Sequence, residues 1–446
     1  MFGASKTASV SGGYQISRSL RFNSADSAYL NRTPASAGNR QIFTWSAWVK
    51  RTALGSAYYG IFGASTGLNT YTAYWLNNDN LWLYSYTSGT ENYAFQTTQL
   101  FRDTSAWYHL VIATDTTQAT NTNRIKIYVN GSQVTAFSYT KYPTQNFNDY
   151  IDNNIAHTLG WTDGNTGYYD GYMTEVNFVD GQQLTPSSFG ETSATTGVWQ
   201  PKAFAGTYGT NGFYLNFSDN SNTTAATLGK DYSGNGNNWT PNNFSVTAGA
   251  GNDSLVDSPT SYGTDTGAGG EVRGNYSTLS PLFFNGVTTI VPTNGNLDFT
   301  FAGAANRSAY STMGMSSGKW YCEVIYTTVG SSPSVGISLT TNVDTSTFVG
   351  YGASQYSYES GYKHNNNSSV LYGATFTNND VIGIAFDADA GTITFYKNGV
   401  SQGVAYSSIP AGTYLFGVTS YQGTGNINFG QRAFAYTAPS GFKALC

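Results

Sequence analysis

Short segments in which apolar and polar residues alternate recur through most of the chain. In "IFTWSAWVK", which begins at Ile42, every second residue from Phe43 to Val49 is apolar and would lie on one face of an extended strand. Similar segments are "WYHLVIATD" (107–115), "RIKIYVNG" (124–131) and "GYMTEVNFVDG" (171–181). Their length and spacing predict β-sandwich architecture, with turns between short strands.

One such segment occurs twice in similar form. "IKIYVNGSQV" (125–134) and "ITFYKNGVSQG" (393–403) each place an apolar alternation before Asn-Gly and resume afterwards. Asn-Gly favours the two-residue type I′ hairpin loop, because both positions need a positive φ. The repeat predicts two hairpins, each with one apolar face buried in a core. It therefore predicts two related β-sandwiches.

Composition supports an all-β fold and argues against one class of binding partner. The chain has 446 residues with 35 Tyr, 26 Phe and 9 Trp, but only 10% charged residues and a net charge of −5. Aromatic residues and Thr favour strands, whereas Gly and Asn favour turns. No run of Lys or Arg could follow a phosphate backbone, so we expect no nucleic acid partner.

Export, membrane and disulfide signals are weak. "MFGASKTASVSGGYQ" lacks the apolar stretch of a signal peptide, and nowhere do eighteen apolar residues run together, so we expect neither Sec export nor membrane insertion. The two cysteines, Cys322 and Cys446, give no disulfide framework or CxxC metal site. We expect Cys322 to be a buried small hydrophobe.

The distribution of these segments suggests four parts. Residues 1–19, rich in Ser, Gly and Ala, are expected to form an N-terminal arm. Residues 20–190 form the first sandwich and residues 305–446 the second. Between them, residues 191–304 are dense in Gly and Asn and poor in long apolar runs, so they are interpreted as a connector with a few short strands; a small domain there stays open.

At the level of motifs, both halves resemble known families. Residues 20 to about 190 resemble laminin G-like domains of the concanavalin A-like lectin and glucanase superfamily, through "FTWSAWVK", "WYHLVIATD", "IKIYVNGSQV" and "YYDGYMTEVNFVDGQQLTPSSFG". Residues from about 305 to 440 resemble a SPRY domain, through "GKWYCEVIY", "VGISL", "YSYESGYKHNNNSSVLYG" and "NNDVIGIAFDADAGTITFYKNG". The resemblance implies two concanavalin A-like jelly-roll β-sandwiches joined by a loop-rich connector.

The combination is similar to a recurring kind of bacteriophage protein, common among marine phages. This implies a virion structural protein assembled in the host cytoplasm, with other virion proteins and host-surface polysaccharide as expected partners. A tail fibre or adhesive appendage that binds host-surface glycan or protein is the first interpretation. Capsid decoration or a scaffold role that cements neighbouring subunits is the alternative, and a homo-oligomer such as a trimer is compatible with either.

Glycan binding is the leading hypothesis for a site, because aromatic faces stack on sugar C–H surfaces while uncharged polar groups bind hydroxyls. The candidate loops "SAYYG", "GWTDGNTGYYDG" and "QYSYESGYKHNNN" supply Tyr58, Tyr59, Trp161, Asp163, Asn165, Tyr168, Tyr169, Tyr356, Tyr358, Tyr362, His364 and Asn365. The alternative for each aromatic residue is a place in a core or in a cross-strand pair. The "YSYESGY" text also belongs to the SPRY pattern, so Tyr358 and Tyr362 are equally consistent with scaffold.

Neither an enzyme nor a resident cofactor is expected. Glu175 and Asp180 are five residues apart, on opposite faces of a strand, where they cannot act as a catalytic pair. His109, in "WYH", is expected to be a structural hydrogen-bonding residue.

Calcium is the one cofactor left open. Asp163, Asn165 and Asp170 align in one loop, and laminin G-like relatives place metal near such loops. A second segment, "DYSGNGNN" from Asp231, lacks the closing Glu of a calcium loop and is better explained as an Asx-rich turn.

Overall fold

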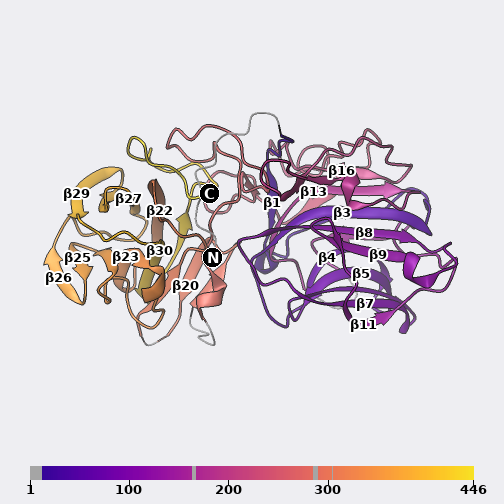
Figure 1. The fold of residues 1–446 in the computed structure, drawn as a ribbon, viewed down its shortest axis with the longest axis horizontal. Helices are drawn as coiled ribbons and strands as arrows, with labels where there is room; N and C mark the ends of the chain where they lie inside the picture. Colours follow the sequence, from indigo (N-terminus) through magenta and orange to yellow (C-terminus); the bar gives the residue numbers. More distant parts are fainter. Residues whose placement is uncertain (1–12, 163–166, 285–289, 304) are drawn as a thin grey trace. The chain divides into compact units, whose positions relative to one another are not determined.

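The computed structural model describes residues 13–162, 167–284, 290–303 and 305–446, and it divides the chain into two compact units. We call Gly12–Thr260 the N-terminal unit and Ser261–Cys446 the C-terminal unit (Figure 1). The all-β prediction is confirmed, since strands account for 45% of the structure and helix for 4%. No helix among the described residues has the length and apolar character needed to cross a bilayer.

Two antiparallel sheets form the N-terminal unit. The sheet that we call the β3 sheet has the order β10-β9-β8-β3-β13-β1-β18, with β16 also paired to β13. Its strands are β1 (Ser19–Phe22), β3 (Ile42–Arg51), β8 (Trp107–Asp115), β9 (Ile125–Val129), β10 (Ser132–Gln133), β13 (Gly171–Asp180), β16 (Phe213–Leu215) and β18 (Ser254–Leu255).

The second sheet, called the β5 sheet, has the order β11-β7-β6-β5-β4-β12-β2-β17. Its strands are β2 (Tyr29–Arg32), β4 (Tyr59–Gly67), β5 (Thr70–Asn77), β6 (Asn80–Thr87), β7 (Thr90–Leu100), β11 (Phe137–Lys141), β12 (Ala156–Leu159) and β17 (Thr240–Asn242). Beside the two sheets stand the pair β14 (Gly190–Thr192) and β15 (Trp199–Pro201) and the 3₁₀ turns η1 (Ser24–Asp26), η2 (Asn121–Asn123) and η3 (Pro186–Ser188).

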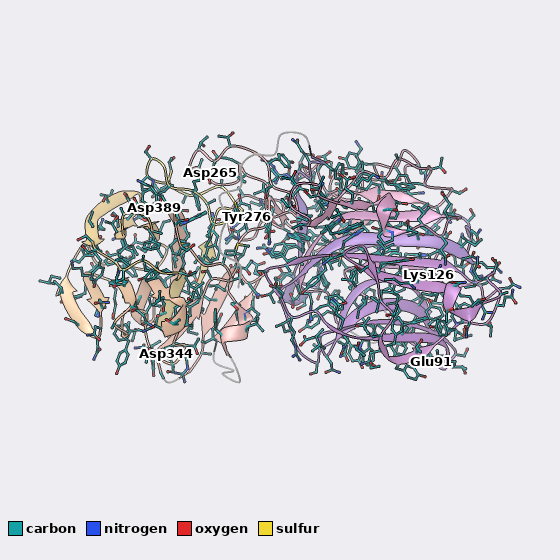
Figure 2. All side chains as sticks on the ribbon, viewed as in Figure 1. Glu91, Lys126, Asp265, Tyr276, Asp344 and Asp389 are labelled. Carbon is teal, nitrogen blue, oxygen red and sulfur yellow. The ribbon has the colours of Figure 1, made fainter. Side chains whose placement is uncertain are left out.

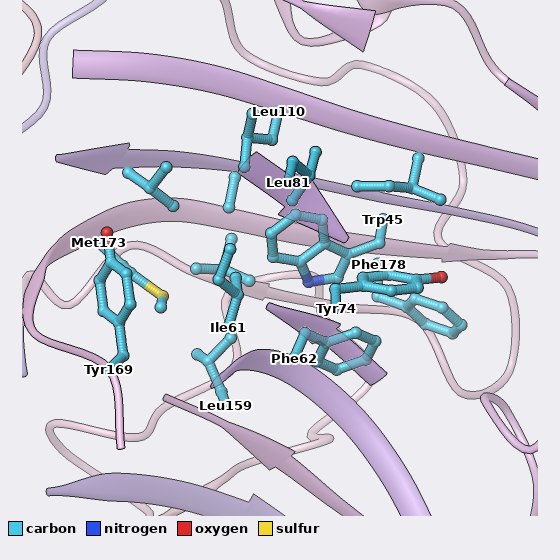
Figure 3. Close-up of a cluster of buried hydrophobic side chains, with 14 of the residues drawn as sticks. Trp45, Ile61, Phe62, Tyr74, Leu81, Leu110, Leu159, Tyr169, Met173 and Phe178 are labelled. Carbon is cyan, nitrogen blue, oxygen red and sulfur yellow. The ribbon is translucent and has the colours of Figure 1, made fainter. Parts of the chain in front are cut away.

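The core of the N-terminal unit lies between these sheets (Figure 3). Trp45 of the β3 sheet stacks on Phe62 of the β5 sheet, with ring centroids 5.7 Å apart. Met173 and Phe178 of β13 are buried in the same cluster. Burial of each large side chain is worth about 1.5–3 kcal/mol, so alternating apolar positions from both sheets supply the main stabilisation.

Two further sheets make up the C-terminal unit. The seven-stranded sheet has the order β19-β20-β31-β22-β27-β28-β29, and the six-stranded sheet has the order β21-β30-β23-β24-β25-β26. The seven strands are β19 (Ile290–Thr293), β20 (Asp298–Phe301), β22 (Lys319–Thr328), β27 (Val381–Asp387), β28 (Thr392–Lys397), β29 (Val400–Tyr406) and β31 (Thr424–Asn428). The six are β21 (Arg307–Tyr310), β23 (Ser331–Leu339), β24 (Gln355–Glu359), β25 (Tyr362–Asn365), β26 (Ser368–Leu371) and β30 (Tyr414–Tyr421), and the 3₁₀ turns are η4 (Pro281–Phe284) and η5 (Thr340–Asn342).

Both Asn-Gly hairpins are present as predicted. Asn130 and Gly131 have φ of 47° and 81°, and Asn398 and Gly399 have φ of 49° and 77°. The strands before these turns, β9 and β28, pair with β10 and β29 after them, and the apolar residues of β9 and β28 are buried. Cys322 is buried, as expected, and burial raises the pKa of its thiol.

The segment 191–304, interpreted above as a connector, is divided between the two units at residues 260 and 261. β16 and β18 extend the β3 sheet and β17 extends the β5 sheet, while Trp239 is fully buried in the core between them. Farther along, β19 and β20 join the seven-stranded sheet. These strands have only two to four residues each, so no periodic pattern marks them in the sequence.

Candidate functional site

The outer surface of the β5 sheet carries a continuous group of aromatic side chains. In β5, Tyr74 and Leu76 point into the core, and the alternation of the strand places Tyr71 and Trp75 on the opposite, outer face. β6 repeats this arrangement, with Leu81 and Leu83 in the core. The outer group, which we call the aromatic face, consists of Tyr58, Tyr71, Trp75, Trp82, Tyr84 and Tyr86.

The pairing register of β5 and β6 brings the rings of the aromatic face side by side. Trp75 lies directly opposite Trp82, and Tyr71 lies opposite Tyr86. Trp75 and Tyr84 stack with centroids 5.7 Å apart, and Tyr84 stacks on Tyr86 at 6.0 Å. Tyr58 meets the edge of this array, at 5.5 Å from Trp75. Such ring pairs add about 0.5–1.5 kcal/mol each beyond the burial of area, so the side chains hold one another in place.

The face is apolar at its centre, where two indole nitrogen atoms are buried. Tyr58, Trp82 and Tyr86 are half-buried, and the rings of Tyr71 and Trp75 are covered by their neighbours. The indole Nε1 groups of Trp75 and Trp82 have no hydrogen-bond partner among the described residues.

A polar margin borders the face on the side of β7 and β11. Tyr139 donates a hydrogen bond to Glu91 Oε1 over 2.9 Å, and Tyr86 donates to Glu91 Oε2 over 3.4 Å. Lys141 lies 3.7 Å from the same carboxylate, so the two charges at this margin offset one another (Glu91 is labelled in Figure 2). Burial raises the pKa of Tyr71 to about 12, and burial together with Glu91 raises the pKa of Tyr86. These hydroxyl groups therefore stay uncharged near neutral pH.

The loop after β12 lies against the other margin of the aromatic face. Gly60 and Gly63 of β4 stand opposite Trp75 and Ala73, and a Cβ at Gly60 would lie 2.7 Å from the backbone nitrogen of Thr162. Because these positions are glycine, the loop backbone can approach the strand closely.

Two of the candidate residues in this loop stack on each other, and a third aromatic ring packs beside them. Trp161 and Tyr168 stack with centroids 5.8 Å apart, and Tyr29 of β2 lies 5.4 Å from Trp161. Asp163 and Asn165 lie outside the described residues. Of the pair in "SAYYG", Tyr58 joins the aromatic face, whereas Tyr59 packs against the core.

Two other residues from this segment have structural contacts. Tyr169 is fully buried and donates a hydrogen bond to the carbonyl oxygen of Lys50 over 3.0 Å, so a ligand cannot reach its ring. Asp170 accepts hydrogen bonds from the backbone nitrogen and the hydroxyl of Ser24, at 2.9 and 2.5 Å. Burial raises the pKa of Asp170, and its carboxylate holds the chain at the start of η1.

The candidates in the C-terminal unit are divided between two faces of the six-stranded sheet. Tyr358 is fully buried and donates to the carbonyl oxygen of Ala374, and Tyr356 packs on Tyr406 with centroids 5.2 Å apart. Tyr362 and His364 pair across β24 with Glu359 and Ser357, which places them on the face opposite Tyr358.

On that opposite face, Tyr362 is 44% exposed. His364 Nε2 lies 3.2 Å from Glu359 Oε2, and burial lowers the pKa of this histidine. Asn365 donates to the carbonyl oxygens of Ala353 and Gln355. These five candidates therefore do not converge on one site.

The arrangement around His109 does not suit base catalysis. Nδ1 accepts a hydrogen bond from the indole of Trp199 over 3.0 Å, so the proton is on Nε2, which faces Ser46 Oγ at 2.8 Å. A base for the serine would need its unprotonated nitrogen there. Burial lowers the pKa of His109 to about 3, and the residue is a structural hydrogen-bonding group, as the sequence suggested.

Glu175 and Asp180 have separate partners. Glu175 accepts hydrogen bonds from Tyr14 and Tyr214, whereas Asp180 accepts from the backbone nitrogens of Asn39 and Asn211. Burial raises the pKa of Glu175 to about 7.

A different carboxyl pair, Asp152 and Asp180, was not foreseen from the sequence. Burial and the neighbouring Asp180 raise the pKa of Asp152 to about 8. Asp152 is 1% exposed, and a Cβ at Gly38 would lie 2.4 Å from its Oδ2, so there is no space for a substrate beside it.

Metal-binding potential is low in the described ranges. No group of three or more His, Cys, Asp or Glu side chains suited to a metal ion occurs among them. The carboxylate of Asp231 accepts hydrogen bonds from the backbone nitrogens of Tyr214, Ser233 and Asn237, which is the Asx-rich turn preferred above.

Comparison with known proteins supports the assignment of both β-sandwich domains. Residues 23–188 match the concanavalin A-like lectin/glucanases superfamily, and residues 319–432 match the SPRY domain. Over 124 residues the chain is 33% identical to Ran-binding protein 9 of Xenopus tropicalis, which is 27% of this chain and 23% of that protein. It is also 33% identical over 126 residues to Ran-binding protein 10 of Danio rerio, which is 27% of this chain and 20% of the relative. The chain thus spans less than a quarter of the length of these relatives.

Solved structures of SPRY domains show weaker likeness. The SPRY domain of human HERC1 has 20% identity and a TM-score of 0.28, with 31% of this chain and 92% of that chain covered. The PSpry domain of TRIM65 has 15% identity and a TM-score of 0.29, with 34% and 92% covered. Domains of the two matched kinds are typically non-enzymatic binding modules. The chain therefore carries a laminin G-like, concanavalin A-like domain followed by a SPRY domain.

Proposed function

We propose that this chain is a non-enzymatic structural protein of a bacteriophage virion, carried on a tail fibre or similar appendage, and that the aromatic face of its N-terminal unit binds host-surface glycan. The observation that carries the proposal is the group of six aromatic side chains on the outside of the β5 sheet. The virion assignment is supported by the order of the two domains, which resembles that of the bacteriophage proteins described above.

The chemistry of the aromatic face favours an uncharged glycan. Flat aromatic rings offer surfaces on which the C–H faces of sugars can stack, and the nearby Tyr hydroxyl groups stay protonated. Glu91 and Lys141 offset each other at the margin, so the face has no excess positive charge to attract an acidic polymer. A neutral chain of sugar residues is complementary to this surface.

The test is binding of purified full-length protein to a glycan array and to host cells, in competition with host polysaccharide. Trp82→Ala combined with Tyr86→Ala removes two half-buried rings, and we expect at least about a fivefold loss of affinity, because the two stacking contacts together are worth at least about 1 kcal/mol. Tyr351→Ala is the matched control, since Tyr351 is an exposed tyrosine of the other unit. Unchanged glycan binding by the folded double variant would exclude the aromatic face as the glycan-binding site.

A second candidate function, decoration of the capsid, is favoured by a different observation. The edge strands β26 and β29 of the C-terminal unit expose Val370, Leu371, Val400 and Val404, and exposed apolar edges are suited to contact another protein. Relatives named Ran-binding proteins also point to a protein ligand for part of the chain. Assembly onto capsids without binding to cells or glycans would favour this function over the first.

A further inference from the structure

The C-terminal unit contains a pocket that none of the candidate residues above lines. Its volume is about 320 Å³, at the lower end of the roughly 300–1,000 Å³ typical of small-molecule sites. Its lining includes Asp265, Lys319, Trp320, Asp389, Lys443 and Cys446, and Figure 2 labels Asp265 and Asp389. The size suits one sugar ring rather than an oligosaccharide.

Four segments distant in sequence are held together around this pocket by hydrogen bonds that backbone N–H groups donate. Residue 443 forms a parallel bridge with Trp320, and its carbonyl oxygen accepts from the backbone nitrogen of Tyr321 over 2.8 Å. Asp265 Oδ2 accepts from the backbone nitrogen of Ala444, and Asp389 Oδ1 accepts from that of Gly318, each over 2.8 Å. The walls are thus fixed before any ligand arrives, which lowers the entropic cost of binding.

The lysine and aspartate side chains that line the pocket are equal in number. Lys319 is paired with Asp387 at 3.0 Å, whereas Lys443 forms no ion pair within the described part of the chain. Asp389 Oδ2 likewise has no hydrogen-bond partner among the described residues, so one donor and one acceptor are available to a ligand. Two lysines and two aspartates around one cavity favour neither a strong anion nor a strong cation.

Trp320 supplies the apolar part of the site. Its indole Nε1 already donates to the carbonyl oxygen of Ser317 over 2.7 Å, and the residue is 7% exposed, so the ring offers a small area of carbon surface rather than a free donor. An aromatic surface beside one free ammonium and one free carboxylate oxygen is complementary to a ring that has a C–H face and neighbouring hydroxyl groups, because each hydroxyl both donates and accepts.

We propose that this pocket binds a single uncharged sugar residue, as a free monosaccharide or as the terminal residue of a glycan. The site is independent of the aromatic face, so it gives the chain a second glycan contact on a separate unit. Binding of one sugar residue is weak, with a dissociation constant on the order of 1 mM, because so small a ligand makes few contacts.

The experiment is saturation-transfer NMR on the full-length protein with methyl glycosides of glucose, galactose, mannose, rhamnose and N-acetylglucosamine. At least one is expected to give a signal that Lys443→Ala and Asp389→Ala each reduce about tenfold, since each change removes a hydrogen bond to a charged group. Both side chains are exposed at the surface, and the controls Lys126→Ala and Asp219→Ala change half-exposed charges of the other unit.

The outcomes separate this inference from the proposed function. Trp82→Ala with Tyr86→Ala is expected to leave the monosaccharide signal intact, and the pocket variants are expected to leave the contact at the aromatic face intact. The pocket assignment is overturned if none of the five glycosides gives a signal or if both pocket variants, melting like the wild type, bind equally well. Stronger binding of glucuronate or glucosamine than of any neutral glycoside would overturn the proposal that the ligand is an uncharged sugar.

Discussion

At Asp152 a carboxyl group is kept in its neutral form by its surroundings. It is buried, it faces the carboxylate of Asp180, and its pKa is raised to about 8 from an ordinary value near 3.9. Its Oδ1 accepts a hydrogen bond from the side chain of Asn211 over 2.8 Å. The pair is therefore best described as one carboxylic acid that donates to one carboxylate.

The raised pKa makes stability depend on pH. The folded state keeps the proton of Asp152 up to about pH 8, whereas the unfolded chain releases it near pH 4, so stability falls as pH rises through this interval. We expect Asp152→Asn to remove this slope, because the amide can donate to Asp180 at every pH. The loss in wild type has an upper limit of about 1.4 kcal/mol per pH unit.

Urea unfolding of both proteins at several pH values measures the difference. Parallel profiles for wild type and Asp152→Asn between pH 4 and 8 would contradict the assignment. Glu175, with its own raised pKa, contributes to the profiles of both proteins, so the comparison isolates Asp152.

The Asn-Gly hairpin shows how turn chemistry and packing act together at the scale of the element. Gly131 has φ of 81°, and a Cβ there would lie 2.7 Å from the ring of Trp199. Gly89, in the turn between β6 and β7, has nearly the same φ of 79° but no heavy atom within 4 Å of such a Cβ. The two glycines form a matched pair that separates backbone strain from crowding.

We expect Gly89→Ala to destabilise the protein by about 1–2 kcal/mol, the cost of a left-handed backbone for a residue with a Cβ. Gly131→Ala has the same cost and also displaces Trp199, which adds about 1–3 kcal/mol. The free energy of unfolding in urea gives both values. Equal losses would show that Trp199 moves away from the hairpin freely.

Element by element, the sequence allowed much of the fold to be predicted. The alternation in strands such as β3 and β8 and both Asn-Gly turns could be recognised because each depends on local preferences. Of the aromatic face, only Tyr58 was among the candidates, and the other rings were missed although "TYTAYWLN" and "NLWLYSYT" carry aromatic residues at positions that alternation assigns to the outer face. Asp152 and Asp180 could not be paired from sequence, since their proximity depends on loops that meet only in the folded unit.

On the scale of the whole molecule, the boundary between the units has a direct test. The N-terminal unit ends at Thr260, and β16, β17 and β18 complete its sheets. We expect a fragment of residues 13–260 to unfold cooperatively, and a fragment of residues 20–190 to be unfolded or aggregated, because it lacks the buried Trp239, Phe213 and Leu215.

Circular dichroism and thermal melting of the two fragments distinguish these outcomes. A fragment of residues 261–446 is the control, and it is expected to fold by itself because it holds both sheets of the C-terminal unit. A cooperative transition in the fragment of residues 20–190 would show that the later strands are dispensable.

The strands that complete the N-terminal unit also limit how such genes can be recombined. An exchange between related genes that breaks near codon 190, where the recognisable lectin-like stretch ends, would separate the two sheets from β16, β17 and β18 and yield a chimera with an incomplete core. A crossover after codon 260 would transfer an intact module. Descendants of this architecture should therefore inherit the Gly- and Asn-rich tract together with the sandwich that precedes it.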